Sequence, residues 1–128
     1  LYMEQERQFA FEKLDVYQHA RILVRDIYHL QNKFPIEERY ALGSQIRRSA
    51  ISITSNIAEG TGRNSIKEKI HFIEIAFGSL TESFCQLQTA QDLGYITEND
   101  MAEMRPKFNH VAVLLSLLKR SLDNKLNL

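Results

Sequence analysis

The sequence predicts an all-α protein, an antiparallel four-helix bundle with up-down-up-down order. Apolar residues recur at alternating spacings of three and four along most of the chain, which is the period of one helix face. The chain holds 5 Gly and 2 Pro in 128 residues, too few for the closely spaced turns of an all-β fold. This length suits one domain, so we expect a single domain over 1–128 with an ordered core over about 11–122.

The first helix is predicted from its apolar series and its two ends. Asp15 is the expected N-cap, because a short carboxylate accepts hydrogen bonds from the free amides of a first turn. Pro35 is expected to end the helix, because the residue before a proline avoids helical backbone angles. The spacings between these ends are four and three in alternation, through Val16, Ala20, Leu23, Ile27, Leu30 and Phe34.

The second helix carries two conflicting patterns. Residues 51–54 alternate as a strand would, and their Ser, Thr and Ile are mediocre helix formers. A helical series nevertheless extends across 16 residues, through Leu42, Ile46, Ala50, Ile53 and Ile57. The longer pattern decides for a helix, because the sequence offers no second strand for pairing. Gly60 suits the left-handed position that follows a helix.

The third and fourth helices have clear starts. Ser65 and Glu68 form a capping-box pattern before the third, and Gly94 is expected just after its end. Thr97 is expected to begin the fourth, in which Pro106 should either kink the helix or mark its true start. The third series is Ile66, Ile70, Ile73, Phe77, Leu80, Phe84 and Leu87, and the fourth is Met101, Met104, Phe108, Val111, Leu115, Leu118 and Leu122.

The charge is neutral in total but segregated along the chain. Lys and Arg number 16, as do Asp and Glu, which argues at first against a strongly basic nucleic-acid binder. Residues 39–71, however, hold six bases and two acids, whereas residues 72–104 hold six acids and no base. We therefore expect a dipolar surface.

Several features favour a cytoplasmic protein without a membrane anchor. Cys85 is the single cysteine, so it cannot form an internal disulfide, and we expect it to fill space beside the core. Residues 1–7 are polar and acidic, unlike a signal peptide. The longest nearly apolar run is residues 111–118, whereas a membrane span needs about 20 residues.

The second helix lacks a charged face over residues 49–58. One flank is apolar or small, and the other carries mostly uncharged hydrogen-bonding groups. We expect this helix to pack against a second copy of the chain as well as against its own core. The alternative is that short Ser and Thr side chains permit tight packing within one chain.

One family signature extends over most of the chain. It comprises Phe34-Pro35, residues 38–42, residues 45–52, Asn56-Ile57-Ala58-Glu59-Gly60, Arg63, Phe72, residues 76–80 and Glu82. From about Phe11 to Leu122 the chain resembles the bacterial four-helix-bundle family that includes proteins encoded in intervening sequences of 23S ribosomal RNA genes. It differs at Ala41 and Ser49, where the family more often has Gly and Ala.

The resemblance implies an up-down-up-down bundle that assembles as a ring, usually of five subunits, without enzymatic activity. It also implies kinship with the accessory variability protein of diversity-generating retroelements, a basic pentameric barrel that binds nucleic acid and a reverse transcriptase. For Asn56 and Glu59 a structural role and a ligand-contacting role both stay open. The signature and interface candidates are Gln45, Ser52, Asn56, Glu59, Gly60, Gly78, Ser79 and Glu82.

The basic segment is the best functional lead. Repeated around a ring, its charges would supply the many phosphate contacts that drive salt-dependent binding of RNA or DNA. Alternatively, they pair with the acidic segment 72–104 of the same or an adjacent subunit and bind nothing else. The nucleic-acid-binding candidates are Arg39, Arg47, Arg48, Arg63, Lys67 and Lys69.

Catalytic patterns are sparse. Arg105 and His110 fit the Arg-x4-His pattern of HEPN-type ribonucleases, in which His acts as acid or base, but chance accounts for such a match in this sequence. The ingredients of a di-iron site, Glu68 with His71, Asp26 with His29, Glu59 and Glu103, lie on the wrong helix faces. We expect no metal, no cofactor and no enzyme activity, with a nuclease or a protein-interaction adaptor as the alternatives.

Overall fold

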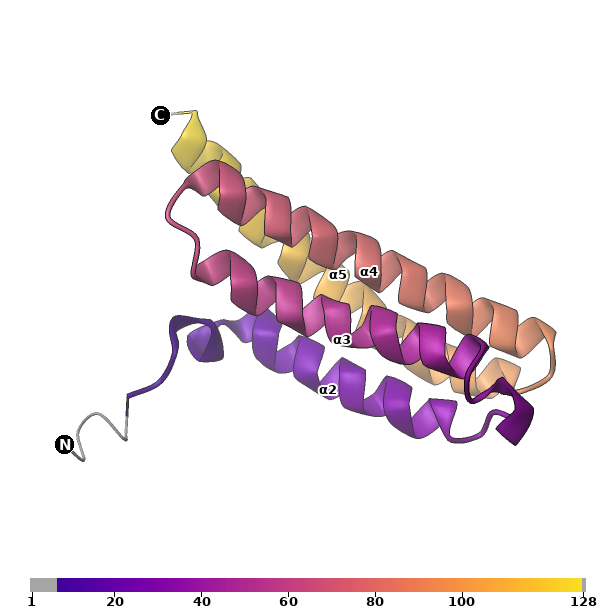
Figure 1. Ribbon diagram of the computed structural model, residues 1–128. Helices are drawn as coiled ribbons and strands as arrows, with labels where there is room; N and C mark the ends of the chain where they lie inside the picture. The colour runs from indigo at the N-terminus through magenta and orange to yellow at the C-terminus, as the bar shows by residue number, and fades with distance from the viewer. Residues whose placement is uncertain (1–6, 128) are drawn as a thin grey trace.

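Four long helices make up the computed structural model, which describes residues 7–127 (Figure 1). They are α2 (Asp15–Gln31), α3 (Leu42–Thr61), α4 (Ile66–Asp92) and α5 (Glu98–Leu126). A short 3-10 helix, η1 (Ala10–Lys13), precedes α2, and a second, η2 (Ile36–Glu38), lies between α2 and α3. Each long helix runs back beside the one before it in Figure 1. The predicted all-α four-helix architecture is confirmed. The prediction that residues 1–7 are not a signal peptide falls largely on residues 1–6, which lie outside the described residues.

One apolar core runs along the bundle axis and draws on all four helices. Each fully buried Leu or Ile side chain stabilises the fold by about 1.5–3 kcal/mol. Phe77 is an exception to the predicted series, because its side chain is 38% exposed and the inward position of that turn is taken by Ala76. The largest wholly buried apolar side chains are Leu23, Ile27, Ile46, Ile53, Ile57, Leu87, Val111 and Leu115.

The predicted caps of α4 and α5 are present. The Ser65 hydroxyl accepts a hydrogen bond from the Glu68 amide at 3.1 Å, and the Thr97 hydroxyl accepts one from the Asp100 amide at 3.0 Å. Gly94 follows α4 with a φ of +79°, the left-handed conformation expected of it. These three ends were predictable because each cap involves residues within one turn of the chain.

The predicted ends of α2 were wrong by a few residues. Leu14 is the N-cap and Asp15 is the first helical residue, where its carboxylate still favours the positive end of the helix dipole. The helix ends at Gln31, and the amide of Phe34 bonds to the Gln31 carbonyl at 3.0 Å in a tighter turn. Phe34 nevertheless reaches the core, which explains its place in the apolar series.

Gly60 does not follow α3, as predicted, but lies inside the helix and is buried. A Cβ at this position would lie 3.1 Å from the Cβ of Phe72, so a glycine here permits the close approach of α3 and α4. Thr61 ends the helix instead, and Gly62 follows with an ordinary φ of −84°.

Pro106 lies well inside α5 and does not mark its start. The helix begins at Glu98, and Thr97 caps it. Met101 and Met104, both buried, anchor the turns that precede the proline. Packing therefore holds the backbone helical through a residue that supplies no amide hydrogen.

Candidate nucleic-acid interface

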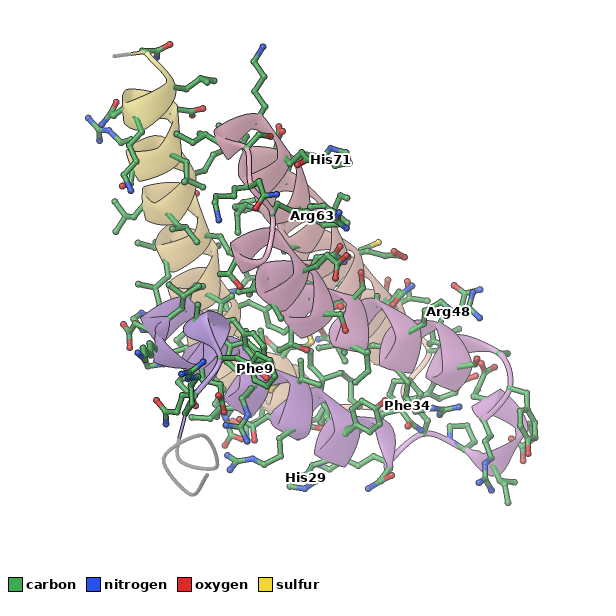
Figure 2. All side chains as sticks on the ribbon, turned by 60° about the vertical axis from the view of Figure 1, so that its left-hand side comes forward. Phe9, His29, Phe34, Arg48, Arg63 and His71 are labelled. Carbon is green, nitrogen blue, oxygen red and sulfur yellow. The ribbon has the colours of Figure 1, made fainter. Side chains whose placement is uncertain are left out.

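The six candidate cations fall into two groups at opposite ends of α3. Arg39, Arg47 and Arg48 lie near its beginning, whereas Arg63, Lys67 and Lys69 lie near its end and in the first turn of α4. Fifteen residues separate Arg48 from Arg63, which corresponds to about 22 Å along a helix axis. Figure 2 shows these two labelled side chains far apart along the bundle. The single cluster suggested by the sequence is therefore two separate patches.

The first group contains one structural arginine. Arg47 donates to the Gln31 side-chain oxygen at 3.0 Å and to the Arg39 carbonyl at 2.8 Å, so it ties α3 to the end of α2 and to the turn after η2. Arg39 lies over the ring of Tyr40, 5.7 Å from its centroid, and is exposed. Arg48 is also exposed. These last two guanidinium groups remain accessible from solution.

The second group is partly engaged in local contacts. Arg63 pairs with Glu59 one turn before it and lies 4.7 Å from the centroid of the Phe72 ring. The Lys69 ammonium donates to the Thr61 carbonyl at 3.1 Å, which caps the end of α3. Lys67 is exposed. It is the most accessible cation of this group.

The acidic segment is not the partner of these cations within the chain. Its Asp100 pairs with Lys33 at 2.8 Å, and its Glu74 lies 3.7 Å from Lys119. No ion pair in residues 7–127 joins segment 39–71 to segment 72–104. The predicted alternative of neutralisation inside one subunit is therefore wrong, and neutralisation between subunits stays a prediction.

A hydrogen-bonded chain of uncharged side chains joins α3 to α4. The Asn56 amide donates to the Ser52 hydroxyl at 2.9 Å and to the Ser52 carbonyl at 2.8 Å. The Ser79 hydroxyl of α4 donates to the same Ser52 hydroxyl at 2.7 Å. Three of the signature candidates therefore meet in one place, where they hold two helices together.

The same chain continues into the core from the Ser79 carbonyl, which lies 2.9 Å from the Ser83 hydroxyl. Its buried members are Ser49, noted above as a departure from the family pattern, and Ser83 and Gln86, which the sequence did not single out. Ser83, wholly buried, donates to the Ser49 hydroxyl at 2.8 Å, and Ser49 donates to the Gln86 side-chain oxygen at 2.8 Å. We call the six residues Ser49, Ser52, Asn56, Ser79, Ser83 and Gln86 the polar seam. On each helix the three members of the polar seam are spaced three and four residues apart, so they share one helix face, and this spacing was the signal available in the sequence.

The polar seam explains one uncharged flank of α3. That flank satisfies its hydrogen bonds on α4 of the same chain, as the alternative of tight packing within one chain predicted. The other flank is different, because Ile51 is 45% exposed. An oligomer contact on that second flank stays a prediction.

The family model of the 23S rRNA-intervening sequence protein matches residues 12–117. The chain belongs to this family. The match covers both basic groups, the polar seam and most of α5, so the resemblance inferred from the signature is confirmed. None of the curated proteins searched matches the chain. No helix within residues 7–127 has the length and apolar character needed to cross a membrane.

Other signature positions of this family member lie on the surface. Gln45 and Glu82 are exposed, and a Cβ added to Gly78 would meet no atom within 4 Å in the described part of the chain. Glu59 is held by Arg63. Gly60, Ser52, Asn56 and Ser79 thus have an internal structural role, whereas the structure shows none for Gln45, Gly78 and Glu82.

Arg105 and His110 do not form one catalytic site in this family member. Arg105 lies over the Phe84 ring, 4.8 Å from its centroid, in a groove between α4 and α5. His110 contacts the His19 ring in a different groove, between α2 and α5. The two side chains therefore face away from each other, and the geometry does not support a nuclease that uses both.

The residues considered for a di-iron site are dispersed. Asp26 binds Lys107 and Arg25, at 2.8 and 3.2 Å. Burial works to raise the pKa of Asp26, but the hydrogen bonds and charges of Lys107 and Arg25 outweigh it, so the pKa lies below its usual range. No group of three or more His, Cys, Asp or Glu side chains in residues 7–127 is arranged to hold a metal ion. Cys85 is exposed, contrary to its predicted space-filling role.

Proposed function

We propose that the chain is a non-enzymatic, cytoplasmic homo-oligomer, a ring of five subunits, that binds structured RNA or DNA through repeated basic patches. The observation that carries this proposal is the availability of the cations in segment 39–71. Only Arg63 among the six candidates forms an ion pair within the described residues. Arg39, Arg48 and Lys67 are exposed and can reach phosphate groups.

The basic patches must be repeated around a ring because one chain presents few accessible cations. Two patches about 22 Å apart can each contact a few phosphates of one nucleic acid. A ring multiplies these contacts, and each neutralised phosphate releases counterions, which strengthens binding at low salt. Folded RNA and duplex DNA, with dense phosphate backbones, are the ligands that such spacing suits.

Charge and exposed apolar surface support the assembly. The acids of segment 72–104 are largely exposed and the cations of segment 39–71 are largely unpaired, so neighbouring copies have complementary charges to offer. Ile51 on α3 and Val113 and Leu117 on α5 are each exposed by 45% or more. Val113 and Leu117 lie one turn apart on α5, and contiguous exposed apolar side chains of this kind support a contact with another subunit.

The family supports the nucleic-acid part of the proposal. Its description names an intervening sequence of 23S rRNA, which associates these proteins with an RNA gene. The kinship implied by the signature adds a reverse transcriptase as the proposed protein partner. In that setting, a basic ring would position a nucleic acid for the partner rather than act on it chemically.

Fluorescence anisotropy with a folded RNA and with duplex DNA tests the proposal. We expect binding at about 50 mM salt and a steep loss of affinity by about 200 mM, because several phosphate contacts are made. The double variant R48Q/K67Q should bind more weakly. The slope of log affinity against log salt concentration should become shallower by about one unit for each phosphate contact removed. R21Q removes an exposed charge on α2, outside both patches, and should leave binding unchanged.

The alternative is a protein-interaction adaptor that binds no nucleic acid. A groove of about 280 Å³ between α4 and α5, lined by Phe77, Phe84 and Phe108, favours it. Absence of binding to either nucleic acid at about 50 mM salt would leave this alternative in place.

A further inference from the structure

Two histidines from distant parts of the chain meet at the surface between α2 and α5. The ring centroids of His19 and His110 lie 4.4 Å apart, with their planes at 84°. Both line a groove of about 260 Å³ whose floor is apolar, formed by Leu23 and Val111. His110 is exposed and His19 is half-buried, so solutes can reach both rings.

The spacing of the two rings suits a shared metal ion. Neutral imidazole nitrogens are common ligands of Zn²⁺, Cu²⁺ and Ni²⁺. Bonds of about 2.0–2.1 Å from one ion to two imidazoles place the ring centroids roughly 4.5–5.2 Å apart, the larger value for a tetrahedral ion. The observed separation of 4.4 Å is close to the lower end of this range, and the ion binds once the two rings turn so that one nitrogen of each faces it.

Neighbouring charges favour a cation at this place. The Nε2 atom of His19 lies 3.4 Å from a carboxylate oxygen of Asp15, one helical turn earlier. A carboxylate beside a metal-bound histidine orients the ring and raises its basicity. The nearest cation of the groove, Lys107, is bound to Asp26 at 2.8 Å, so its charge is compensated there.

We propose that His19 and His110 form a two-histidine site for a divalent transition-metal ion, Zn²⁺ by preference, with Asp15 as the orienting carboxylate. Water fills the remaining coordination positions, since the protein supplies two ligands. The bound ion links α2 to α5 and stabilises the bundle without taking part in any reaction. Ninety-one residues separate the two histidines, which is why no sequence motif indicated the site.

Zinc titration of the full chain tests the site. The protein carries no histidine tag and has Cys85 replaced by Ser, so that no added imidazole and no exposed thiol competes for the ion. Calorimetry with ZnCl₂ near neutral pH should show one ion per chain, and the melting temperature should rise, because the ion binds the folded state. H19A and H110A should each lose this binding by at least about tenfold.

The double variant H29A/H71A is the matched control, because both its histidines are exposed and lie far apart (Figure 2). It should bind zinc as the parent does. D15N should weaken binding by about tenfold while leaving the stoichiometry at one. No zinc binding by the parent at millimolar ion, full binding by H19A or H110A, or an equal loss in H29A/H71A would each overturn the proposal.

Nuclear magnetic resonance provides a readout that does not depend on mutations. Substoichiometric Cu²⁺ should broaden the ring signals of His19 and His110 together, because a bound paramagnetic ion relaxes nearby protons. The signals of His29 and His71 should stay sharp. Broadening of all four signals to the same extent would show non-specific binding and contradict the site.

Discussion

The Lys107 ammonium lies 2.8 Å from a carboxylate oxygen of Asp26 and joins α5 to α2. A second pair, at 2.8 Å, joins Asp100 of α5 to Lys33 in the turn that follows α2. Asp26 on α2 and Lys33 in the turn just after α2 are seven residues apart, and their partners on α5, Lys107 and Asp100, are seven residues apart in the opposite direction. Seven residues are about two helical turns, so both pairs fit one antiparallel register of α2 and α5.

These ion pairs predict acid sensitivity. The hydrogen bond from Lys33 lowers the pKa of Asp100, with help from Thr97, and the pKa of Asp26 is lowered by Lys107 and Arg25 against the effect of burial. A depressed folded-state pKa adds stability above the unfolded value of about 3.9, and this is lost as pH falls through the folded value. We expect the free energy of unfolding, measured by urea titration, to fall steeply below about pH 4.

The double variant D26N/D100N is the control for acid sensitivity. It should be less stable than the parent at neutral pH and should show a shallower fall in acid, because the two linked carboxyls are gone. An unchanged acid slope in this variant would show that other groups carry the pH dependence.

The buried part of the polar seam predicts an unusual mutational pattern. S49A leaves the Gln86 oxygen without its hydroxyl donor and should lower the free energy of unfolding by about 1–3 kcal/mol. The triple variant S49A/S83A/Q86L removes donors and acceptors together and should cost less than S49A alone. S55A, at an exposed position of α3, is the control and should change stability by less than about 0.5 kcal/mol.

The two glycines inside helices predict opposite effects. G78A should raise the free energy of unfolding by about 0.5–1 kcal/mol, because an added Cβ meets open space and alanine favours a helix. G60V should lower it, because Phe72 already lies 3.1 Å from the position of a Cβ. Urea titration of both variants checks the sign, and an equal effect would disprove the close approach of α3 and α4 at Gly60.

The exposed flank of α3 predicts assembly. Light scattering at micromolar concentration should report a mass near five times the 14.9 kDa of one chain. I51K should lower that mass without unfolding the helices, because a charge at a subunit contact loses its hydration. I36K changes another exposed apolar residue, on η2, and should leave the mass unchanged; a monomeric parent protein would refute the ring.

The helices and several of their ends followed from the sequence because their causes are local. Apolar spacing identified all four helices, and Ser65, Thr97 and Gly94 were predictable as caps because each acts within one turn. The same reasoning failed where a distant segment intervenes. Gly60 stays helical because α4 approaches it closely, and Phe77 lies at the surface because Ala76 takes its place in the core.

The charge segments, the family signature and the four-helix architecture could be predicted from the sequence alone. Which side chains are engaged in contacts and which stay exposed depends on how the helices pack. This packing engages Arg47 with Gln31, leaves Arg48 exposed, and brings His19 to His110 across 91 residues. The physical reason is that helix periodicity and capping act over a few residues, whereas a side chain's partners depend on which helices pack together and in which register.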